Sequence, residues 1–107
     1  MTDGTPTRRT DREYKAARHL LLASRLARTA RAYITPHDID LAGLMDECYT
    51  PSEILICKAA NTVWNGQGNA NLYDLAVTLD EQNMKAVIEA IIVLTDVRPG
   101  PLTMPRF

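Results

Sequence analysis

Residues 11–34 read DREYKAARHLLLASRLARTARAYI, a stretch that contains neither glycine nor proline. Alanine, leucine and arginine make up most of it, and all three are strong helix formers. At 100° per residue one side of this helix is apolar, while Arg18, Arg25 and Arg28 fall on the opposite side with Arg31 at its edge. The stretch therefore predicts one long amphipathic helix, whose apolar stripe consists of Ala16, Leu20, Ala23, Leu26, Ala27, Ala30 and Ile34.

Signals that end one helix and begin the next divide the middle of the chain. Thr35-Pro36 ends the first helix and predicts a second over 36–47, with Thr35 as its cap. Residues 50–53 (TPSE) match a capping box with proline at the first helical position. The third helix is expected to end near Gly66, where glycine suits a left-handed conformation.

Two further helices are predicted beyond the turn at 65–69 (NGQGN), which we interpret as a helix-to-helix loop. Asn71 is expected to cap a short helix over 72–77. Residues 78–81 (TLDE) match another capping box and predict a last helix to about Thr95. The run 86–97 is rich in β-branched residues and also fits a buried strand, but its length and the capping box favour a helix.

The chain has 107 residues, the size of a single domain, and 46% of them are apolar while only 6% are aromatic. We expect an all-α fold, a single compact domain of four to five helices with a long basic N-terminal helix. Residues 1–10 are predicted to be a flexible N-terminal arm, 11–98 the helical domain, and 99–107 a loose C-terminal tail. The expected core consists of Leu20, Leu26, Ile34, Leu44, Ile54, Leu55, Val63, Leu75, Leu79, Val87, Ile88 and Ile91, with Trp64 covering one end.

Charge is distributed unevenly along the chain. Eight of the twelve basic residues precede Ala32, together with only three of the thirteen acidic residues. From there to the C-terminus four basic residues stand against ten acidic ones, although the net charge of the whole chain is only −1. Such asymmetry says more about association and partners than about the fold.

No pattern in the sequence predicts a catalytic, cofactor-binding or metal-binding site. His19, His37, Cys48 and Cys57 do not have the spacing of a zinc site, and the two cysteines are expected to be thiols in the core. No serine or cysteine has a histidine at helical spacing that would activate it. We therefore expect no catalytic, cofactor-binding or metal-binding residue and no enzymatic activity. The absence of a long apolar run and of a signal peptide favours a cytoplasmic protein without a membrane span.

The basic side of the first helix is the surface on which we expect a protein partner. Leu21 projects from its middle, and an apolar residue ringed by arginine and tyrosine is typical of an interface hot spot. The sequence leaves open whether this helix docks on its own domain or on a neighbour's. The predicted partner-binding residues are Tyr14, Arg18, Leu21, Arg25 and Arg28.

The last helix is apolar over more than one face, which is more than the core of a small monomer easily hides. Self-association is the simplest use of such a surface, so we predict a homodimer. Its interface is expected to contain Ile88, Ile91 and Ile92.

Nucleic acid is the alternative partner, because arginines on one helix face and on a flexible arm can neutralise backbone phosphates. The chain's isoelectric point near 6.1 is low for a dedicated nucleic-acid binder. The helix pair over 36–65 is too acidic to enter a groove of DNA. The residues that would contact phosphates are Arg8, Arg9, Arg12, Arg18, Arg25 and Arg28.

Residues 58–66 (KAANTVWNG) and 73–83 (YDLAVTLDEQN) resemble small, mostly uncharacterised helical proteins of bacteriophages and prophages of high-GC Gram-positive bacteria. The Ala- and Arg-rich first helix fits the same style. This resemblance lies in the general style of these segments and not in a catalytic motif, so it identifies no functional residue. It implies an accessory protein of the cytoplasm that binds and modulates a phage or host component.

Overall fold

The structure is a computed structural model that describes residues 5–66 and 68–95, with side chains described from Asp11 onward. This part of the chain is helical apart from its turns and one isolated bridge between Ile34 and Ile39, so the predicted all-α fold is confirmed. The elements are α1 (Thr5–Ala23), α2 (Ala27–Ala30), the 3-10 helix η1 (Arg31–Tyr33), α3 (Leu41–Met45), α4 (Pro51–Asn65), α5 (Leu72–Thr78) and α6 (Glu81–Thr95).

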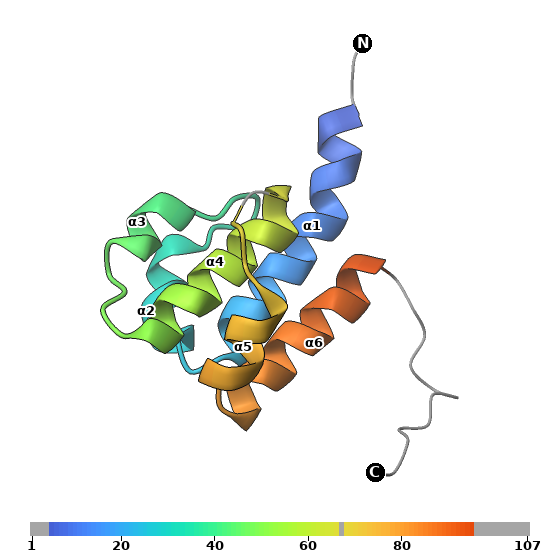
Figure 1. Cartoon of the computed structure of the whole chain (residues 1–107). Coiled ribbons are helices and arrows are strands. Elements are labelled where there is room, and N and C mark those ends of the chain that lie inside the picture. Colours follow the sequence, from blue (N-terminus) through green and yellow to red (C-terminus); the bar gives the residue numbers. More distant parts are fainter. Residues whose placement is uncertain (1–4, 67, 96–107) are drawn as a thin grey trace.

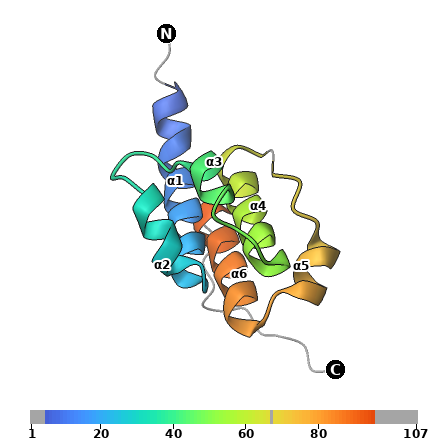
Figure 2. The same cartoon turned by 90° about the vertical axis from the view of Figure 1, so that its left-hand side faces the viewer.

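Helix α1 is the centre of the domain, because both long helices α4 and α6 pack along it (Figures 1 and 2). Two neighbours require a broader apolar face than the single stripe expected from the sequence. Ala16 and Leu20 are fully buried as predicted, but Ala17 and Leu21 are fully buried as well. The prediction that Leu21 projects from an exposed basic face is therefore wrong.

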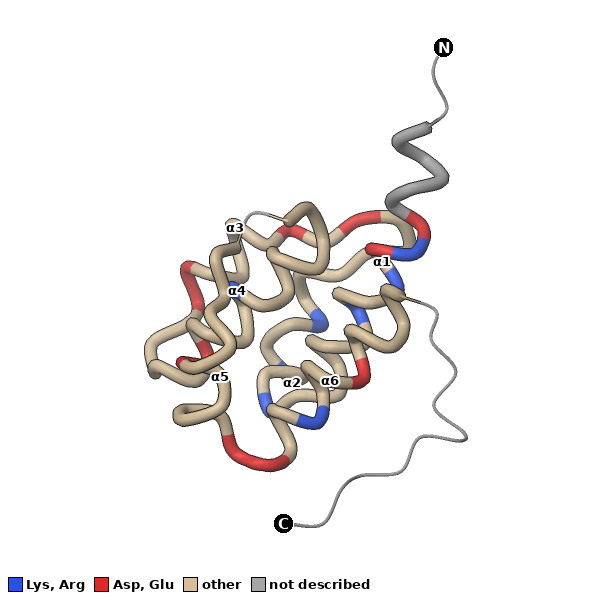
Figure 3. Tube along the Cα trace, turned by 45° about the vertical axis from the view of Figure 1, so that its right-hand side comes forward, with Lys and Arg blue, Asp and Glu red and all other residues tan. Residues whose placement is uncertain are grey.

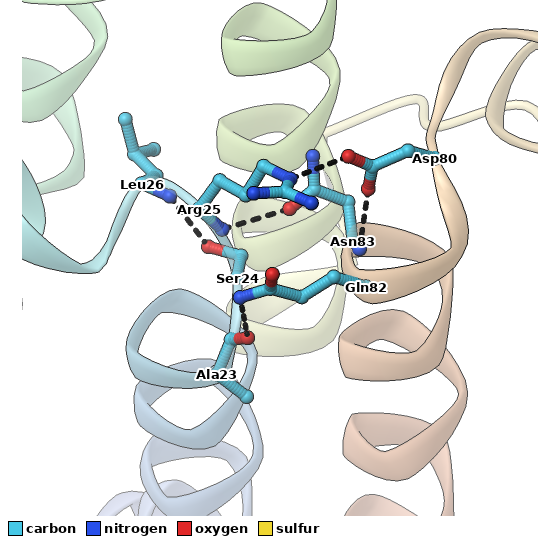
Figure 4. A network of polar contacts seen from close by, with 7 residues as sticks. All are labelled: Ala23, Ser24, Arg25, Leu26, Asp80, Gln82 and Asn83. Atoms are coloured by element: carbon cyan, nitrogen blue, oxygen red, sulfur yellow. Dashed lines mark hydrogen bonds and ion pairs between the residues drawn. The ribbon is translucent and has the colours of Figure 1, made fainter.

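The predicted continuous helix over 11–34 is also wrong, because the chain leaves helical conformation at 24–26. The hydroxyl of Ser24 donates to the carbonyl of Leu21 at 2.9 Å and accepts from the amide of Leu26 at 3.2 Å. The amide of Arg25 donates to Oδ1 of Asn83 on α6, at 2.8 Å (Figure 4). A side chain from another helix thus satisfies the backbone group that the break exposes. At its other end, α1 begins at Thr5, six residues before the expected start, and residues 1–4 lie outside the described part.

The second predicted helix is much shorter than expected. Thr35 Oγ1 does accept from the amide of Asp38 at 3.0 Å, as a cap would, but the chain then closes a tight loop. The bridge between Ile34 and Ile39 holds this loop together, and Ile39 is buried beneath it. Asp40 caps α3 instead, since its side chain accepts from the amide of Gly43 at 3.0 Å.

Local capping signals predicted the three later helices well. Thr50 and Glu53 form the expected capping box of α4, with Pro51 in its first turn, and Gly66 ends that helix at φ +78°. Asn71 caps α5 through the amides of Tyr73 and Asp74. The cap of α6 is the exception: the expected box of Thr78 and Glu81 is replaced by Asp80, whose side chain accepts from the amide of Asn83 at 2.9 Å.

The core is aliphatic, as expected, but smaller side chains contribute more than the sequence indicated. Alanines of α1, α4 and α6 are buried where these helices meet, which lets their axes approach closely. Ile88 and Ile91 are 49% and 42% exposed, so their placement in the core is wrong. Ile34, Ile54 and Leu55 are only partly buried, and the predicted core residues that are buried are Leu20, Leu26, Leu44, Val63, Leu75, Leu79 and Val87.

Trp64, in the last turn of α4, packs partly buried against the core as expected. Its indole meets the ring of Tyr14 edge to face, with 6.0 Å between ring centroids and 67° between the planes. This contact joins α4 to the exposed end of α1. It also fixes the position of Tyr14 at the rim of the surface described next.

Candidate functional site

An open groove of about 1150 Å³ runs along the exposed side of α1. The segment 34–37, which follows η1, forms one wall of the groove. Val93, in the C-terminal part of α6, lies at the other wall. Leu22, Ile34 and Val93 give it an apolar floor, whereas its rim is mostly cationic or polar. The lining residues are Asp11, Tyr14, Lys15, Arg18, His19, Leu22, Ala23, Ile34, Thr35, Pro36, His37 and Val93.

A second hollow of about 330 Å³ continues this groove toward η1. Arg18, Leu22, Arg31 and Ile34 line it, and three of these four residues also line the first hollow. Arg18 therefore stands between the two, with the side chains of Leu22 and Ile34 as a common floor. We call the two hollows together the α1 groove.

Two basic residues at the α1 groove, Lys15 and His19, already have acidic partners. Lys15 Nζ lies 3.5 Å from a carboxylate oxygen of Asp11, one turn away on the same helix. His19 Nε2 lies 2.8 Å from Glu89 Oε1, and this contact ties α1 to α6. The Lys15–Asp11 pair is well exposed and contributes little to stability, whereas the His19–Glu89 contact is partly buried.

Arg18 and Arg31 differ from these basic residues. Both are exposed, and within residues 11–66 and 68–95 no carboxylate lies in ion-pair range of either guanidinium. An arginine with an open planar fork next to an apolar floor can bind a carboxylate with two parallel hydrogen bonds. The α1 groove thus offers unused cationic donors beside an apolar surface.

Tyr14 stands at the edge of the α1 groove with its hydroxyl already engaged. That hydroxyl donates to the carbonyl oxygen of Thr35, while the ring packs against Trp64. These contacts hold the loop that forms one wall against α1. Tyr14 therefore lines the groove and holds one of its walls in place.

The remaining predicted partner residues are not part of this groove. Leu21 is fully buried and cannot contact a partner in this fold. Arg25 sits at the break after α1, where its Nε lies 2.5 Å from Oδ2 of Asp80 (Figure 4). Arg28 on α2 is exposed and has no carboxylate partner among the described residues, but it does not line either hollow.

The residues expected to contact nucleic acid are spread over more than one surface. Arg12, Arg18 and Arg28 are exposed, whereas Arg25 is held by Asp80 and the side chains of Arg8 and Arg9 lie outside the described part. Figure 3 shows basic residues gathered on α1, on α2 and near α6, with acidic residues prevailing on the side of α3, α4 and α5. The described domain therefore has a basic and an acidic side.

Sequence reasoning missed the floor and one wall of the groove. Leu22 and Arg31 lay at the margins of the predicted stripe and basic face, and Ile34 was assigned to the core. The signal that pointed to this wall is Thr35-Pro36, which marks where the chain leaves the helix and turns back. The contact between His19 and Glu89 joins residues 70 apart in the chain and left no local pattern.

Cys48 and Cys57 are brought together, which their separate places in the sequence did not indicate. Both are buried thiols; the thiol of Cys48 donates to the carbonyl of Leu44 and that of Cys57 to the carbonyl of Leu41. Burial raises the pKa of Cys57 to about 12 and also raises the pKa of Cys48. They lie away from the α1 groove, and among the described residues no group of three or more potential ligands is placed to hold a metal ion.

None of the helices described is both long enough and apolar enough to span a bilayer. No protein-family model, curated protein or solved structure matches this chain.

Proposed function

We propose that this chain is a non-enzymatic binding protein whose α1 groove holds an acidic, amphipathic segment of a protein partner. The observation that supports this most directly is the position of Arg18 and Arg31. Two guanidinium groups without described acidic partners flank the apolar floor made by Leu22 and Ile34.

The shape and chemistry of the groove define the partner segment. Apolar side chains would cover the floor, and carboxylates on either side would reach Arg18 and Arg31. Aromatic and arginine residues at the centre of a partly apolar surface are typical of interfaces in which few contacts dominate binding. An amphipathic helix with acidic flanks has this arrangement of groups.

A protein partner is favoured over nucleic acid because the cations of this surface are few and interrupted. Lys15 already contacts Asp11 and His19 contacts Glu89, so Arg18 and Arg31 are the groove arginines left without a described acidic partner, too few to follow a run of phosphates. The apolar floor would remain uncovered by a sugar-phosphate backbone. The resemblance of the sequence to phage proteins supports a role for this chain as a modulator of a phage or host component.

The test uses a fluorescein-labelled helical peptide with leucines along one face and glutamates on both sides, and a scrambled peptide of the same composition. Fluorescence anisotropy should detect binding of the first peptide by the full chain and much weaker binding of the second. Arg18→Glu and Arg31→Glu should each weaken binding by about tenfold or more, since each reverses a charge facing a carboxylate.

Arg28→Glu is the matched control, because it makes the same change of charge on an exposed arginine outside the groove. Its effect should stay within about threefold of wild type. If Arg28→Glu weakens binding as much as Arg18→Glu does, net charge rather than the groove attracts the peptide and the proposal fails. Tight, sequence-independent binding of a DNA duplex or an RNA strand with a steep salt dependence would instead support the nucleic-acid alternative.

A further inference from the structure

Helix α5 exposes an unusual amount of apolar side chain. Leu72, Tyr73 and Val77 are 71%, 73% and 61% exposed. One turn of helix separates Leu72 from Ala76 and Tyr73 from Val77, so these four residues share the outer side of α5. The opposite side is buried through Leu75, which packs into the core. We call the four outer residues the α5 face.

The α5 face has acidic surroundings. Asp74 lies on the same helix and Glu81 follows soon after its last turn, both of them exposed, whereas Asp80 between them is already paired with Arg25. The α5 face is therefore apolar and has the exposed carboxylates of Asp74 and Glu81 next to it in the chain, a combination that the α1 groove is suited to bind.

We infer that the α5 face of one copy of this chain docks in the α1 groove of a second copy, head to tail. This inference rests on the proposed function of the groove and names a partner for it. The charge complementarity of the two surfaces supports it: Arg18 and Arg31 on the groove side meet the carboxylates around α5, and the floor of Leu22 and Ile34 meets apolar side chains.

The α5 face and the α1 groove of one molecule cannot contact each other. Figure 2 shows α5 and α2 on opposite sides of the domain, and the groove lies between α1 and the segment that follows η1. Two different surfaces meeting in this way form a heterologous contact, which leaves one groove and one α5 face open at the ends of every dimer. Association therefore continues with concentration unless a ring closes.

Sedimentation velocity of the full chain from about 10 µM to about 1 mM should show a weight-average mass that rises with concentration and falls when salt is added. Two double variants separate the surfaces. Arg18→Glu with Arg31→Glu disables the groove, and Tyr73→Lys with Val77→Lys disables the α5 face while changing only exposed residues.

Each double variant alone should remain monomeric, and an equimolar mixture of the two should form a 1:1 complex. The mixture works because one variant keeps an intact groove and the other keeps an intact α5 face. In a two-fold symmetric dimer in which one surface meets its own copy, the variant that keeps this surface would associate alone, and mixing would restore nothing further. Failure of the mixture to form a complex therefore overturns the inference.

Ile91→Lys is the matched control, since Ile91 is an exposed apolar residue on α6, outside both surfaces. It should associate like wild type; loss of association in this variant but not in the α5 variant would assign the contact to the outer side of α6. A wild-type chain that stays monomeric at every concentration also overturns the inference. The α5 variant keeps its groove, so its binding of the acidic peptide reports on the proposed function separately.

Discussion

The side-chain oxygen of Asn83 on α6 accepts a hydrogen bond from the backbone amide of Arg25, with 2.8 Å between the two atoms. Asn83 is only 3% exposed, and its own amide is capped by Asp80 at 2.9 Å. The break after α1 and the start of α6 therefore form one joint (Figure 4). This joint sets the direction in which the chain leaves α1 toward the basic segment of α2 and η1.

Asn83→Leu should destabilise the fold by about 1 to 3 kcal/mol, because it leaves the amide of Arg25 without a partner in a partly buried place. Chemical denaturation monitored by circular dichroism measures this change. Gln82→Ala is the control, since Gln82 is exposed and reaches the carbonyl of Ala23 only at 3.4 Å. Equal stabilities of the two variants would show that the joint has no such role.

Acid should weaken the cap of α4. The amides of Tyr49 and Thr50 donate to Oε1 of Glu53, and these hydrogen bonds lower the pKa of its carboxyl. Because this pKa is lower in the folded state, the stabilisation is present above the ordinary glutamate value of about 4.3 and is lost as the pH falls.

Glu53→Gln should therefore be less stable than wild type at neutral pH, and the difference should shrink as the pH falls through the glutamate range. Melting temperatures of both proteins measured across this range provide the comparison. Parallel curves for the two proteins would contradict the assigned role of the carboxylate.

Gly68→Ala should destabilise the chain by about 1 to 3 kcal/mol through overpacking. A Cβ at this position would lie 1.9 Å from the carbonyl oxygen of Lys58 and 2.5 Å from Oγ1 of Thr62. Gly66→Ala is a useful comparison, because a Cβ there meets nothing within 4 Å and only its φ of +78° opposes the change. Thermal melting should rank Gly68→Ala below Gly66→Ala, and the reverse order would show that the loop does not press against α4.

The two thiols should react slowly with iodoacetamide at pH 8, and Cys57 more slowly than Cys48. Cys57 is fully buried and burial raises its pKa to about 12, whereas Cys48 is 8% exposed. Only the thiolate reacts, so the folded chain should be labelled far more slowly than the denatured chain. Mass spectrometry of digested samples assigns each site, and rapid labelling of Cys57 in the folded chain would contradict its burial.

The same raised pKa has a consequence for stability at high pH. The folded state keeps the thiol of Cys57 protonated where the unfolded chain already loses the proton. The contribution of the Cys57 thiol to the stability of the fold is therefore complete below the ordinary cysteine pKa of about 8.5. It is lost as the pH rises toward 12.

Features set by neighbouring residues were predictable from the sequence. The capping box of Thr50 and Glu53, the cap at Asn71 and the left-handed Gly66 all lie within a few residues of the helix end that they define. Their hydrogen bonds form wherever the local backbone permits, with little help from the rest of the fold. The all-α class follows from the same local signals.

Features set by distant residues were not predictable in this way. The helix break at 24–26 depends on Asn83, which is 58 residues away from Arg25 in the chain. Leu21 is buried because α4 and α6 both pack on α1, and periodicity alone indicated only one buried stripe. The prediction of the candidate site was incomplete for the same reason. The sequence indicated the arginine side of α1, but the apolar floor of the α1 groove depends on how the segment 34–37 folds back.

The most direct test of the α1 groove is a titration of the isotope-labelled chain with the acidic helical peptide, followed by amide NMR shifts. Shifts should concentrate on residues 14–23, on 34–37 and at Val93, and Arg18→Glu should require about tenfold more peptide, or more, to produce them. Shifts that instead cluster on the outer side of α6, or that scatter over the whole surface, would contradict a binding site in the groove.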